Sequence, residues 1–331
     1  MPDFSIIQAT SMKNVYIVNP LRTPIGRYGG GLAGVRIDDM AASVLSAVVS
    51  RSGLPGDAID DVIIGCANQA GEDNRNVARM ATLLAGLPQS VPATTINRLC
   101  GSALDATIYA ARAIAAGEAE VVIAGGAEVM SRAPYVIPKN ATGKTQFGNL
   151  TAFDTALGWR FPNRKMKAMF PLEAMGETAE NIAEQWKIDR TRQDEFALRS
   201  HELSIAAWDR GFYDSSVMPV EIPQRKGDPV VVSRDEGPRP GSSVEKLGAL
   251  RAVFREGGSV TAGNSSSLND GAGALIVASE DAVKEYGLTP VLRYCGGATA
   301  GVDPRLADLR DAIAELPEEL EQVVLARYSR G

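Results

Sequence analysis

Residues 94–105 have the sequence TTINRLCGSALD, in which a polar, turn-prone segment leads to a single cysteine, Cys100. Gly and Ser follow, and the next residues, 104–116, are rich in Ala, Leu and Ile, which predicts a helix. A thiol at the start of a helix lies where backbone N–H groups and the positive end of the dipole favour the thiolate. This spacing alone supports two interpretations equally: a nucleophile, or a small buried apolar residue.

Length and composition narrow the classes of protein. The chain has 331 residues, of which 45% are hydrophobic and 22% charged, and this is enough for one large domain or two. The net charge is −6 and no long basic run is present, so nucleic acid is not an expected partner. No apolar segment approaches the roughly 20 residues that span a bilayer, and the first residues lack the pattern of a secretory signal. We therefore expect no membrane partner.

The cysteines and the histidine indicate the compartment and argue against a metal. Cys66, Cys100 and Cys295 are far apart in the sequence and have no paired spacing, which is typical of a reducing compartment. The only histidine is His201. Because structural metal sites use clustered Cys and His ligands, no metal site is expected. The predicted location is the cytoplasm.

Alternating apolar runs and helical patterns predict an α/β fold. Apolar runs predict buried strands at residues 14–18, 61–65, 93–96, 120–124, 274–278 and 291–294, and the pattern of the sheet domain resumes near Val260. Helices are predicted at residues 38–50, 76–85, 104–116 and 280–286. Strands that alternate with helices predict a mostly parallel sheet covered on both faces.

Residues 131–258 differ from the rest of the chain. They are polar, weakly periodic and interrupted by Pro and Gly. Two helices are predicted there, at 177–186 and at 190–210, the second with Asp189 as its N-cap. We interpret this region as a loop domain inserted into the sheet domain, and such insertions commonly hold binding residues.

Residues 29–34, GGGLAG, formally match the dinucleotide-binding pattern G-x-G-x-x-G. That fingerprint requires the glycines to follow a strand directly and to open a helix. Here two prolines and an arginine follow the first predicted strand, and the next predicted helix begins only near Asp38. The pattern therefore favours a mobile glycine loop over a nicotinamide site.

With these motifs in view, the chain resembles the thiolases, the acyltransferases that make or cleave a 3-ketoacyl-CoA. The resemblance covers about residues 14–305. Its motifs are RTPIG (22–26), GEDNRNVAR (71–79), NRLC (97–100), GG (125–126), MSRAP (130–134), TAEN (178–181), TAGN (261–264) and LNDG (268–271). The run GCANQAG at 65–71 is similar to the bacterial 3-oxoadipyl-CoA thiolases of aromatic catabolism.

The resemblance implies a layered thiolase fold with a complete N-terminal half and a truncated C-terminal half. The implied organisation is an N-terminal extension (1–13), an N-terminal domain (14–288) with its inserted loop domain (131–258), and the start of a C-terminal domain (289–331) that ends in an unrelated tail. A homo-oligomer, dimer or tetramer, is implied as well.

The resemblance also implies roles for individual residues. Cys100 corresponds to the nucleophile that accepts the acyl group as a thioester, with its own backbone N–H in an oxyanion hole. The implied contacts with coenzyme A are Met175, Arg239, Ala262 and Ser266. Two positions depart from the family: Ala174 stands where thiolases have histidine, and Ser267 where they usually have glycine. Cys66 and Cys295 match no catalytic position and are predicted to be packing residues.

The implied substrates are acetyl-CoA or a 3-ketoacyl-CoA, with no permanently bound cofactor. Thiolases also use a histidine base and a second cysteine from the C-terminal half, and no matching motif occurs in this sequence; His201 falls in a segment that resembles a non-catalytic one. Turnover by this chain is therefore doubtful. The alternative function is a non-catalytic subunit or fragment that binds acyl-CoA or joins an oligomer.

Overall fold

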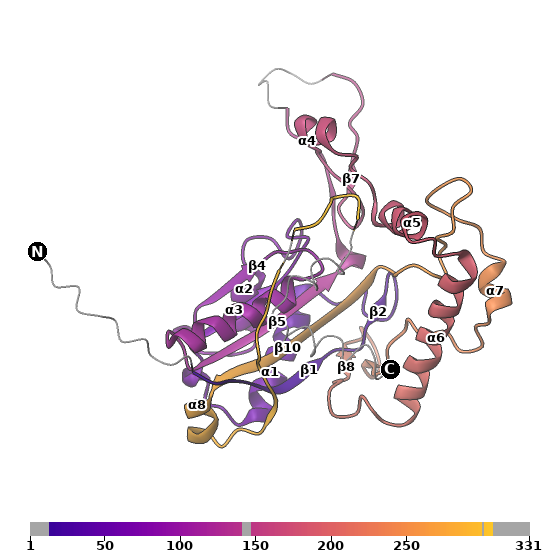
Figure 1. Cartoon of the computed structure of the whole chain (residues 1–331). Helices are drawn as coiled ribbons and strands as arrows, with labels where there is room; N and C mark the ends of the chain where they lie inside the picture. The colour runs from indigo at the N-terminus through magenta and orange to yellow at the C-terminus, as the bar shows by residue number, and fades with distance from the viewer. Residues whose placement is uncertain (1–12, 141–146, 300, 307–331) are drawn as a thin grey trace, which may run out of the picture.

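The computed structural model describes residues 13–140, 147–299 and 301–306. Within them a seven-stranded sheet has helices on both faces, and a second group of helices lies beside it (Figure 1). The strands are β1 (Val15–Arg22), β2 (Gly26–Arg27), β3 (Asp61–Gly65), β4 (Ala93–Ile96), β5 (Val121–Val129), β6 (Tyr135–Val136), β7 (Phe153–Asp154), β8 (Val220–Ile222), β9 (Val230–Val232), β10 (Asn269–Ser279) and β11 (Pro290–Arg293). The α-helices are α1 (Ile37–Ser52), α2 (Val77–Leu84), α3 (Ser102–Ala116), α4 (Arg164–Met169), α5 (Met175–Gln185), α6 (Arg190–Asp209), α7 (Val244–Gly248) and α8 (Glu280–Glu285).

The order of the sheet is β11-β1-β10-β5-β3-β4, and β2 pairs with one end of β10. β3 is parallel to both β4 and β5, whereas β10 is antiparallel to both β5 and β1. β1, β3, β4 and β5 therefore share one direction, so the prediction of a mostly parallel sheet is confirmed. The antiparallel β10 in the middle of the sheet was not evident from the apolar pattern.

Each face of the sheet has its own apolar core. α1 and α2 cover one face, where Leu45 and Val48 of α1 pack with Ile64 and Ile123 from the strands. On the other face α3 presents Ala106, Ala110 and Ile114, which are fully buried against the sheet. Their spacing of four residues forms one face of a helix. The small alanines let α3 lie close to the strands.

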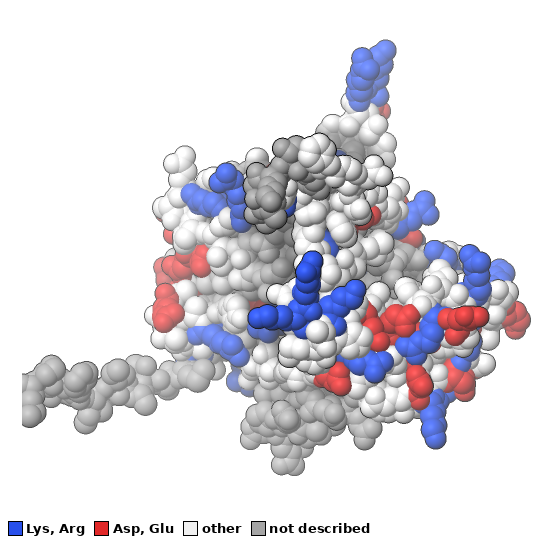
Figure 2. All heavy atoms as spheres, turned by 90° about the horizontal axis from the view of Figure 1, so that it is seen from above, with Lys and Arg blue, Asp and Glu red and all other residues white. Residues whose placement is uncertain are grey.

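The region between β5 and β10 is built differently. α5, α6 and α7 lie together beside the sheet, at the right in Figure 1, and α4 lies at the top. α6 has only two buried residues, Asp194 and Ala207, among its 20. Seen from above in Figure 2, basic and acidic side chains are interspersed over this part of the surface. This region therefore depends more on polar contacts than on apolar packing.

Most predicted elements are present with shifted ends. The Asp189 side chain caps α6 by accepting a hydrogen bond from the Arg192 N–H, as predicted. α3 begins at Ser102 rather than Leu104, and β5 continues to Val129. No strand begins at Val260: the sheet resumes with β10 at Asn269, because residues 259–268 form turns that bind α5 and α6.

Two expectations concern the ends of the chain. Of the predicted N-terminal extension only Lys13 lies within the described residues, and of the predicted tail after Arg305 only Leu306 does. Across the described ranges, none of the helices has the length and apolar character needed to span a membrane.

Candidate active site

Cys100 lies at the edge of the sheet where the parallel strands end. Gly65, the last residue of β3, pairs with Ile96 on one side and Gly126 on the other. The segments that leave this edge contain Cys66 after β3 and Cys100 shortly after β4. Ligands of α/β proteins commonly bind at the carboxyl ends of such strands.

Two glycines let α3 begin directly against this edge. A Cβ on Gly65 would lie 2.5 Å from the Ala103 nitrogen and 2.5 Å from the Ser102 carbonyl carbon. A Cβ on Gly126 would lie 2.7 Å from the Ala103 Cβ. Since backbone atoms cannot rotate away, any larger residue at position 65 displaces the start of the helix. The sheet thus fixes the helix terminus that follows Cys100.

The turn that presents Cys100 is held by local hydrogen bonds. The Asn97 Oδ1 accepts a bond of 2.8 Å from the Leu99 N–H. The Ser102 Oγ accepts one of 2.7 Å from the Arg98 N–H and donates one of 2.6 Å to the Leu99 carbonyl. Leu99 has φ = 49°, in the left-handed region. The polar residues around the cysteine therefore build a tight turn.

This turn leaves Cys100 exposed. The interpretation of Cys100 as a small buried residue is therefore wrong, and the thiol is accessible to a reactant. Cys66, in contrast, is buried, in agreement with a packing role. Cys295 was predicted to pack as well, but it is exposed, because it follows the exposed edge strand β11.

A largely buried polar cluster lies at the ends of β3 and β5. It consists of Cys66, Asp73 and Glu128, whose side-chain S and O atoms all lie within 4.8 Å of one another. Burial, together with the nearby charges of Glu128 and Asp73, raises the pKa of the Cys66 thiol to about 12. Burial also raises the pKa of Glu128. Cys66 is therefore protonated at neutral pH and unsuited to nucleophilic attack.

The four residues predicted to contact coenzyme A lie on the second group of elements. Met175 is the first residue of α5, and Arg239 precedes α7. Ala262 and Ser266 belong to the turns before β10. All four are exposed and hence accessible to a ligand. Arg239 also contacts α6, because its backbone N–H donates a bond of 3.3 Å to the His201 Nδ1.

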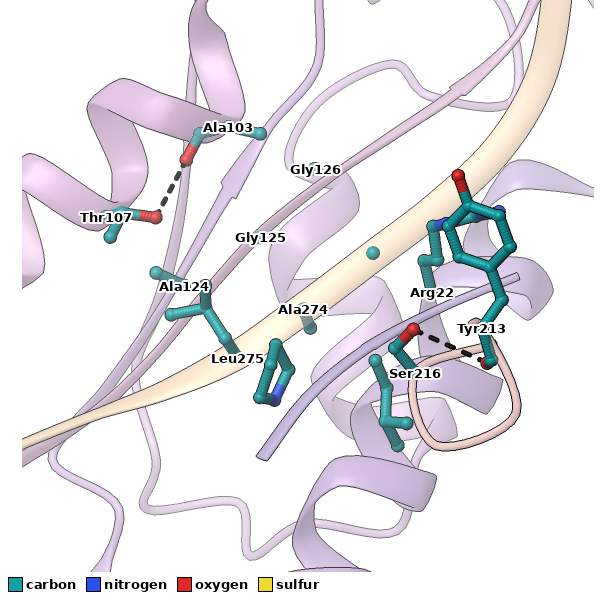
Figure 3. A pocket seen from close by; sticks show the side chains of 13 residues that line it. Arg22, Ala103, Thr107, Ala124, Gly125, Gly126, Tyr213, Ser216, Ala274 and Leu275 are labelled. Atoms are coloured by element: carbon teal, nitrogen blue, oxygen red, sulfur yellow. Dashed lines mark hydrogen bonds between the residues drawn. The ribbon is translucent and has the colours of Figure 1, made fainter. Parts of the chain in front are cut away.

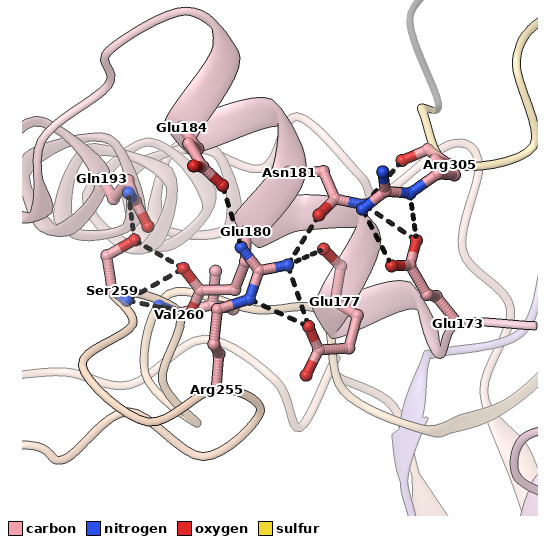
Figure 4. Close-up of polar contacts among 10 residues, drawn as sticks. All are labelled: Glu173, Glu177, Glu180, Asn181, Glu184, Gln193, Arg255, Ser259, Val260 and Arg305. Atoms are coloured by element: carbon pink, nitrogen blue, oxygen red, sulfur yellow. Dashed lines mark hydrogen bonds and ion pairs between the residues drawn. The ribbon is translucent and has the colours of Figure 1, made fainter. Parts of the chain in front are cut away.

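Buried carboxylates bind these elements together (Figure 4). Glu180 of α5, 4% exposed, accepts hydrogen bonds from the N–H groups of Ser259 and Val260 and from the Ser259 hydroxyl. Arg255 forms an ion pair with Glu177 at 3.0 Å and donates a bond of 2.6 Å to the Asn181 Oδ1. The segment before Ala262 is thus attached to α5 through Arg255, Ser259 and Val260.

The next turn is attached to α6 in the same manner. The Asn264 Oδ1 accepts a bond from the Thr261 N–H, and its Nδ2 donates one of 2.9 Å to the buried Asp194. Asp194 also pairs with Arg190, one helical turn earlier, at 2.8 Å. The TAGN motif therefore forms a turn whose asparagine joins Ala262 to the helix.

A cavity of about 330 Å³ lies on the α3 face of the sheet (Figure 3). Small residues line its floor, among them Gly125, Gly126 and Ala274, while Tyr213 and Arg22 stand at one side. The Arg22 guanidinium lies 5.1 Å from the centre of the Tyr213 ring. None of the five predicted site residues lines this cavity.

The glycine loop at 29–34 donates hydrogen bonds to an acid and a serine of the protein itself. The Gly31 N–H donates to both carboxylate oxygens of Glu236, at 3.0 and 3.2 Å, and the Gly29 N–H donates to the Ser131 hydroxyl at 2.8 Å. The Gly31 N–H, a donor that a phosphate would need, is therefore already bonded to a carboxylate. This arrangement agrees with the interpretation against a nicotinamide site.

Comparison with known proteins identifies the family to which this fold belongs. Residues 15–281 match the family model of the thiolase N-terminal domain. The chain belongs to the thiolase family. The beta-ketoadipyl-CoA thiolase of Acinetobacter baylyi is 53% identical over 306 residues, which make up 92% of this chain and 75% of that protein.

Solved structures show the same fold. The acetyl-CoA acetyltransferase of Bacillus anthracis superimposes with a TM-score of 0.81 and is 41% identical; the match covers 90% of this chain and 73% of that one. The human mitochondrial 3-ketoacyl-CoA thiolase in complex with CoA has a TM-score of 0.77 and 36% identity, over 86% and 69% of the two chains. These relatives support the acyltransferase rather than the non-catalytic alternative.

Asn97, Glu128 and Glu180 were not evident from the sequence as parts of the site. Asn97 and Glu180 lie within motifs that carried the resemblance, NRLC and TAEN, but nothing in the sequence shows their partners. Glu128 follows two glycines at the end of an apolar run, a position that places a carboxylate at the sheet edge. The position of Glu128 was the only sequence signal that could have pointed to one of these three residues.

Proposed function

We propose that Cys100 is the acyl acceptor of a thiolase reaction, the thiolysis or condensation of a 3-ketoacyl-CoA. The observation that carries this proposal is the exposed thiol at the strand edge, immediately before α3. In thiolysis the Cys100 sulfur attacks the C3 carbonyl carbon of the 3-ketoacyl-CoA, the C2–C3 bond breaks, and the thiol proton ends on C2 of the departing acetyl-CoA. In acylation by acetyl-CoA, which begins condensation, the sulfur attacks the thioester carbonyl carbon and the bond from that carbon to the CoA sulfur breaks. The proton of the Cys100 thiol ends on the released CoA, so atoms and charge balance.

The N-terminus of α3 favours this chemistry. The helix dipole and the first backbone N–H groups stabilise negative charge on the thiolate and on the oxyanion that forms during attack. A thiolate is also a good leaving group when the acyl group returns to CoA. The Cys100 N–H is our candidate for one donor of the oxyanion hole.

Coenzyme A is proposed to bind along Met175, Arg239, Ala262 and Ser266. The guanidinium of Arg239 suits a phosphate of the nucleotide, and Ser266 offers a hydroxyl to the pantetheine amides. The high identity to a beta-ketoadipyl-CoA thiolase supports 3-oxoadipyl-CoA as the substrate, with acetyl-CoA as a product of its thiolysis. No tightly bound cofactor takes part in the proposed reaction.

We propose that the protein works in the cytoplasm as a homo-oligomer, dimer or tetramer. The reaction needs a reduced Cys100, and all three cysteines are free thiols in the structure. Val291 and Leu292 of the edge strand β11 are 53% and 50% exposed, and Leu104 of α3 is 66% exposed. Such apolar side chains suit contact with a second copy.

The division of the chain into a sheet domain (14–288) with an inserted loop domain (131–258) also stands as a proposal. It is supported by the change from apolar packing around the sheet to polar contacts around α5 and α6. Limited proteolysis of the full chain tests it, because cleavage is expected first within 131–258.

Acylation of Cys100 is testable directly. The protein is incubated with acetyl-CoA, and intact mass followed by peptide mapping is expected to show one acetyl group on Cys100. Cys100→Ser should show none, whereas Cys295→Ser, which changes the other exposed thiol, should react like wild type. Acetylation at Cys295 alone, or at neither cysteine, would refute the proposal.

Turnover is measured in parallel as thiolysis of acetoacetyl-CoA and of 3-oxoadipyl-CoA. A higher kcat/KM for 3-oxoadipyl-CoA supports the proposed substrate, and equal values would refute that part. Acylation without thiolysis would show that the 331 residues suffice for the first half-reaction only. Arg239→Ala is expected to raise the KM for CoA with little change in kcat, since it removes a contact that ground and transition states share.

A further inference from the structure

Glu128 connects the buried cluster with the turn of Cys100 through a chain of hydrogen bonds. The Glu128 Oε2 accepts a bond of 2.9 Å from the Ala67 N–H. The carbonyl of the same residue, Ala67, accepts a bond of 3.0 Å from the Asn97 Nδ2. The Asn97 Oδ1 in turn accepts the bond from the Leu99 N–H, next to Cys100. Each link uses a separate donor and acceptor, so the chain is continuous from β5 to the turn.

One end of this hydrogen-bond chain is anchored in the sheet, and the other end lies in the exposed turn that carries Cys100. Glu128 is on β5 and Cys66 directly follows β3, and these strands pair in the core of the sheet. Asn97 and Cys100 are exposed, and Leu99 is 70% exposed, so apolar packing does little to hold the turn. The side chain of Asn97 therefore ties an exposed turn to a segment that is anchored inside the protein.

We propose that Glu128 is a positioning residue for Cys100, acting as a hydrogen-bond acceptor through Ala67 and Asn97. This inference rests on the proposed role of Cys100 and names residues beyond it. An acceptor oxygen at position 128 is required, whereas a negative charge is not. The role differs from that of a catalytic base, since Glu128 acts through two other residues and does not touch the substrate.

The geometry suggests how the chain aids the reaction. A nucleophile reacts fast only when its sulfur is held close to the attacked carbon and in line with it, and a displacement of about 1 Å can cost on the order of 10²-fold in rate. The bond from Leu99 to Asn97 fixes the peptide before Cys100 while Leu99 has a positive φ. Releasing Asn97 frees the turn to relax from that conformation.

The test compares rates of Cys100 acetylation by acetyl-CoA in the full-length protein, determined by mass spectrometry. Glu128→Ala is expected to lower the rate about tenfold or more, within the range for a misplaced nucleophile. Glu128→Gln keeps an acceptor oxygen for the Ala67 N–H and is expected to react within about twofold of wild type. Glu118→Ala, an exposed acid after α3, is the matched control and should react like wild type.

Substitutions of Asn97 test the proposal independently, because they leave Cys66, Asp73 and Glu128 unchanged. Asn97→Asp keeps an acceptor for the Leu99 N–H but cannot donate to the Ala67 carbonyl. If the chain positions Cys100, Asn97→Asp should be nearly as slow as Asn97→Ala. In the double variant Glu128→Ala/Asn97→Ala the rate should be no lower than in the slower single variant, because both changes break one chain.

Several results would overturn the proposal. Wild-type rates in Glu128→Ala or in Asn97→Asp would show that the hydrogen-bond chain from Glu128 to Leu99 does not position Cys100. Equal loss in Glu128→Gln and Glu128→Ala would assign the effect to charge. Alkylation of Cys100 by iodoacetamide is measured on the same variants: if wild type fails to accept acetyl groups, the proposed function fails, while the ranking of alkylation rates still tests the chain.

Discussion

The two parts of the site are held in place by different physical means. The nucleophile region, which comprises the ends of β3, β4 and β5 and the start of α3, rests on apolar cores and on glycines in close contact. The coenzyme region, which comprises α5, α6, α7 and residues 255–266, has few buried apolar residues. It is held by carboxylates such as Glu180 and Asp194 that accept backbone and side-chain N–H groups.

The comparison shows which changes each region tolerates. Close packing responds to added volume, because backbone atoms at van der Waals contact cannot move apart without cost. A polar scaffold responds to the loss of an acceptor, since each donor left behind is unpaired and shielded from water. We therefore expect steric substitutions to affect the nucleophile region most, and substitutions that remove an acceptor to affect the coenzyme region most.

The largest effect is expected for Gly65→Ala. The added Cβ would lie 2.5 Å from backbone atoms of Ser102 and Ala103, which cannot rotate away. Overpacking of this kind costs about 3 kcal/mol and should also shift the start of α3. Urea unfolding measures the loss. Gly34→Ala is the matched control, because nothing lies within 4 Å of its added Cβ. Equal stability of the two variants would contradict the tight contact.

Glu180→Ala should have the next largest effect. It leaves the Ser259 and Val260 N–H groups without their acceptor, which should lower the free energy of unfolding by about 2 kcal/mol. The KM for CoA should rise as well, since residues 259–266 lose their attachment to α5. Urea unfolding and steady-state kinetics check both effects. Glu202→Ala on α6, an exposed acid, serves as the control. Loss of stability with unchanged KM would separate this scaffold from coenzyme binding.

Asp235 allows the contact between β1 and α6 of the coenzyme region to be tested by pH. Burial alone would raise its pKa, but hydrogen bonds from Arg22, from the Ile25 N–H and from Trp208 and the charge of Arg22 lower it on balance. A lowered pKa in the folded state stabilises the protein above about pH 4, the unfolded value, and the gain is lost as pH falls through the folded pKa.

Asp235→Asn should therefore be less stable than wild type by about 1.5 kcal/mol at pH 7, a value that allows for partial exposure to solvent. The difference should shrink at acidic pH, below about pH 4, as Asp235 becomes protonated. Urea unfolding at both pH values checks this. A difference that stays constant with pH would show that the contact of β1 with Asp235 does not depend on the charge of Asp235.

The smallest effect is expected for Glu128→Gln, and its sign is opposite. Burial raises the pKa of Glu128, so the folded state binds a proton more readily than the unfolded chain. Stability then falls as pH rises from about 4.3, the unfolded value, through the folded pKa. At pH 7 Glu128→Gln should be slightly more stable than wild type, and at pH 4 equal to it. A loss above about 1 kcal/mol at pH 7 would contradict this reasoning.

The sequence predicted the helices and strands better than it predicted which of them lie next to each other in the fold. The Asp189 cap and the strand at 61–65 follow from local patterns, because caps and apolar runs depend on a few adjacent residues. The family motifs located Cys100. Local patterns do not encode which strands pair, so the central antiparallel β10 stayed unpredicted.

The connecting residues of the site escaped prediction for a related reason. Glu128 and Ala67 are 61 positions apart, and Glu180 and Val260 are 80 apart. An acid after two glycines or within a helix has many possible partners, and only the folded backbone selects among them. The exposure of Cys100 also depends on the turn around Leu99, whose positive φ is unusual for a residue with a branched side chain.

The place of β10 in the sheet has a consequence for biosynthesis. β1, the first of the described strands along the chain, pairs only with β10 and β11 among those strands, and Val15 faces Ser279. At about 5–20 residues per second, the ribosome needs on the order of 10 to 50 seconds to produce the partner of β1. During that interval an apolar strand waits with open edges, which are prone to pairing with other chains. Completion of this sheet is therefore a late event, and prompt binding of β1 by a chaperone should raise the yield of native protein.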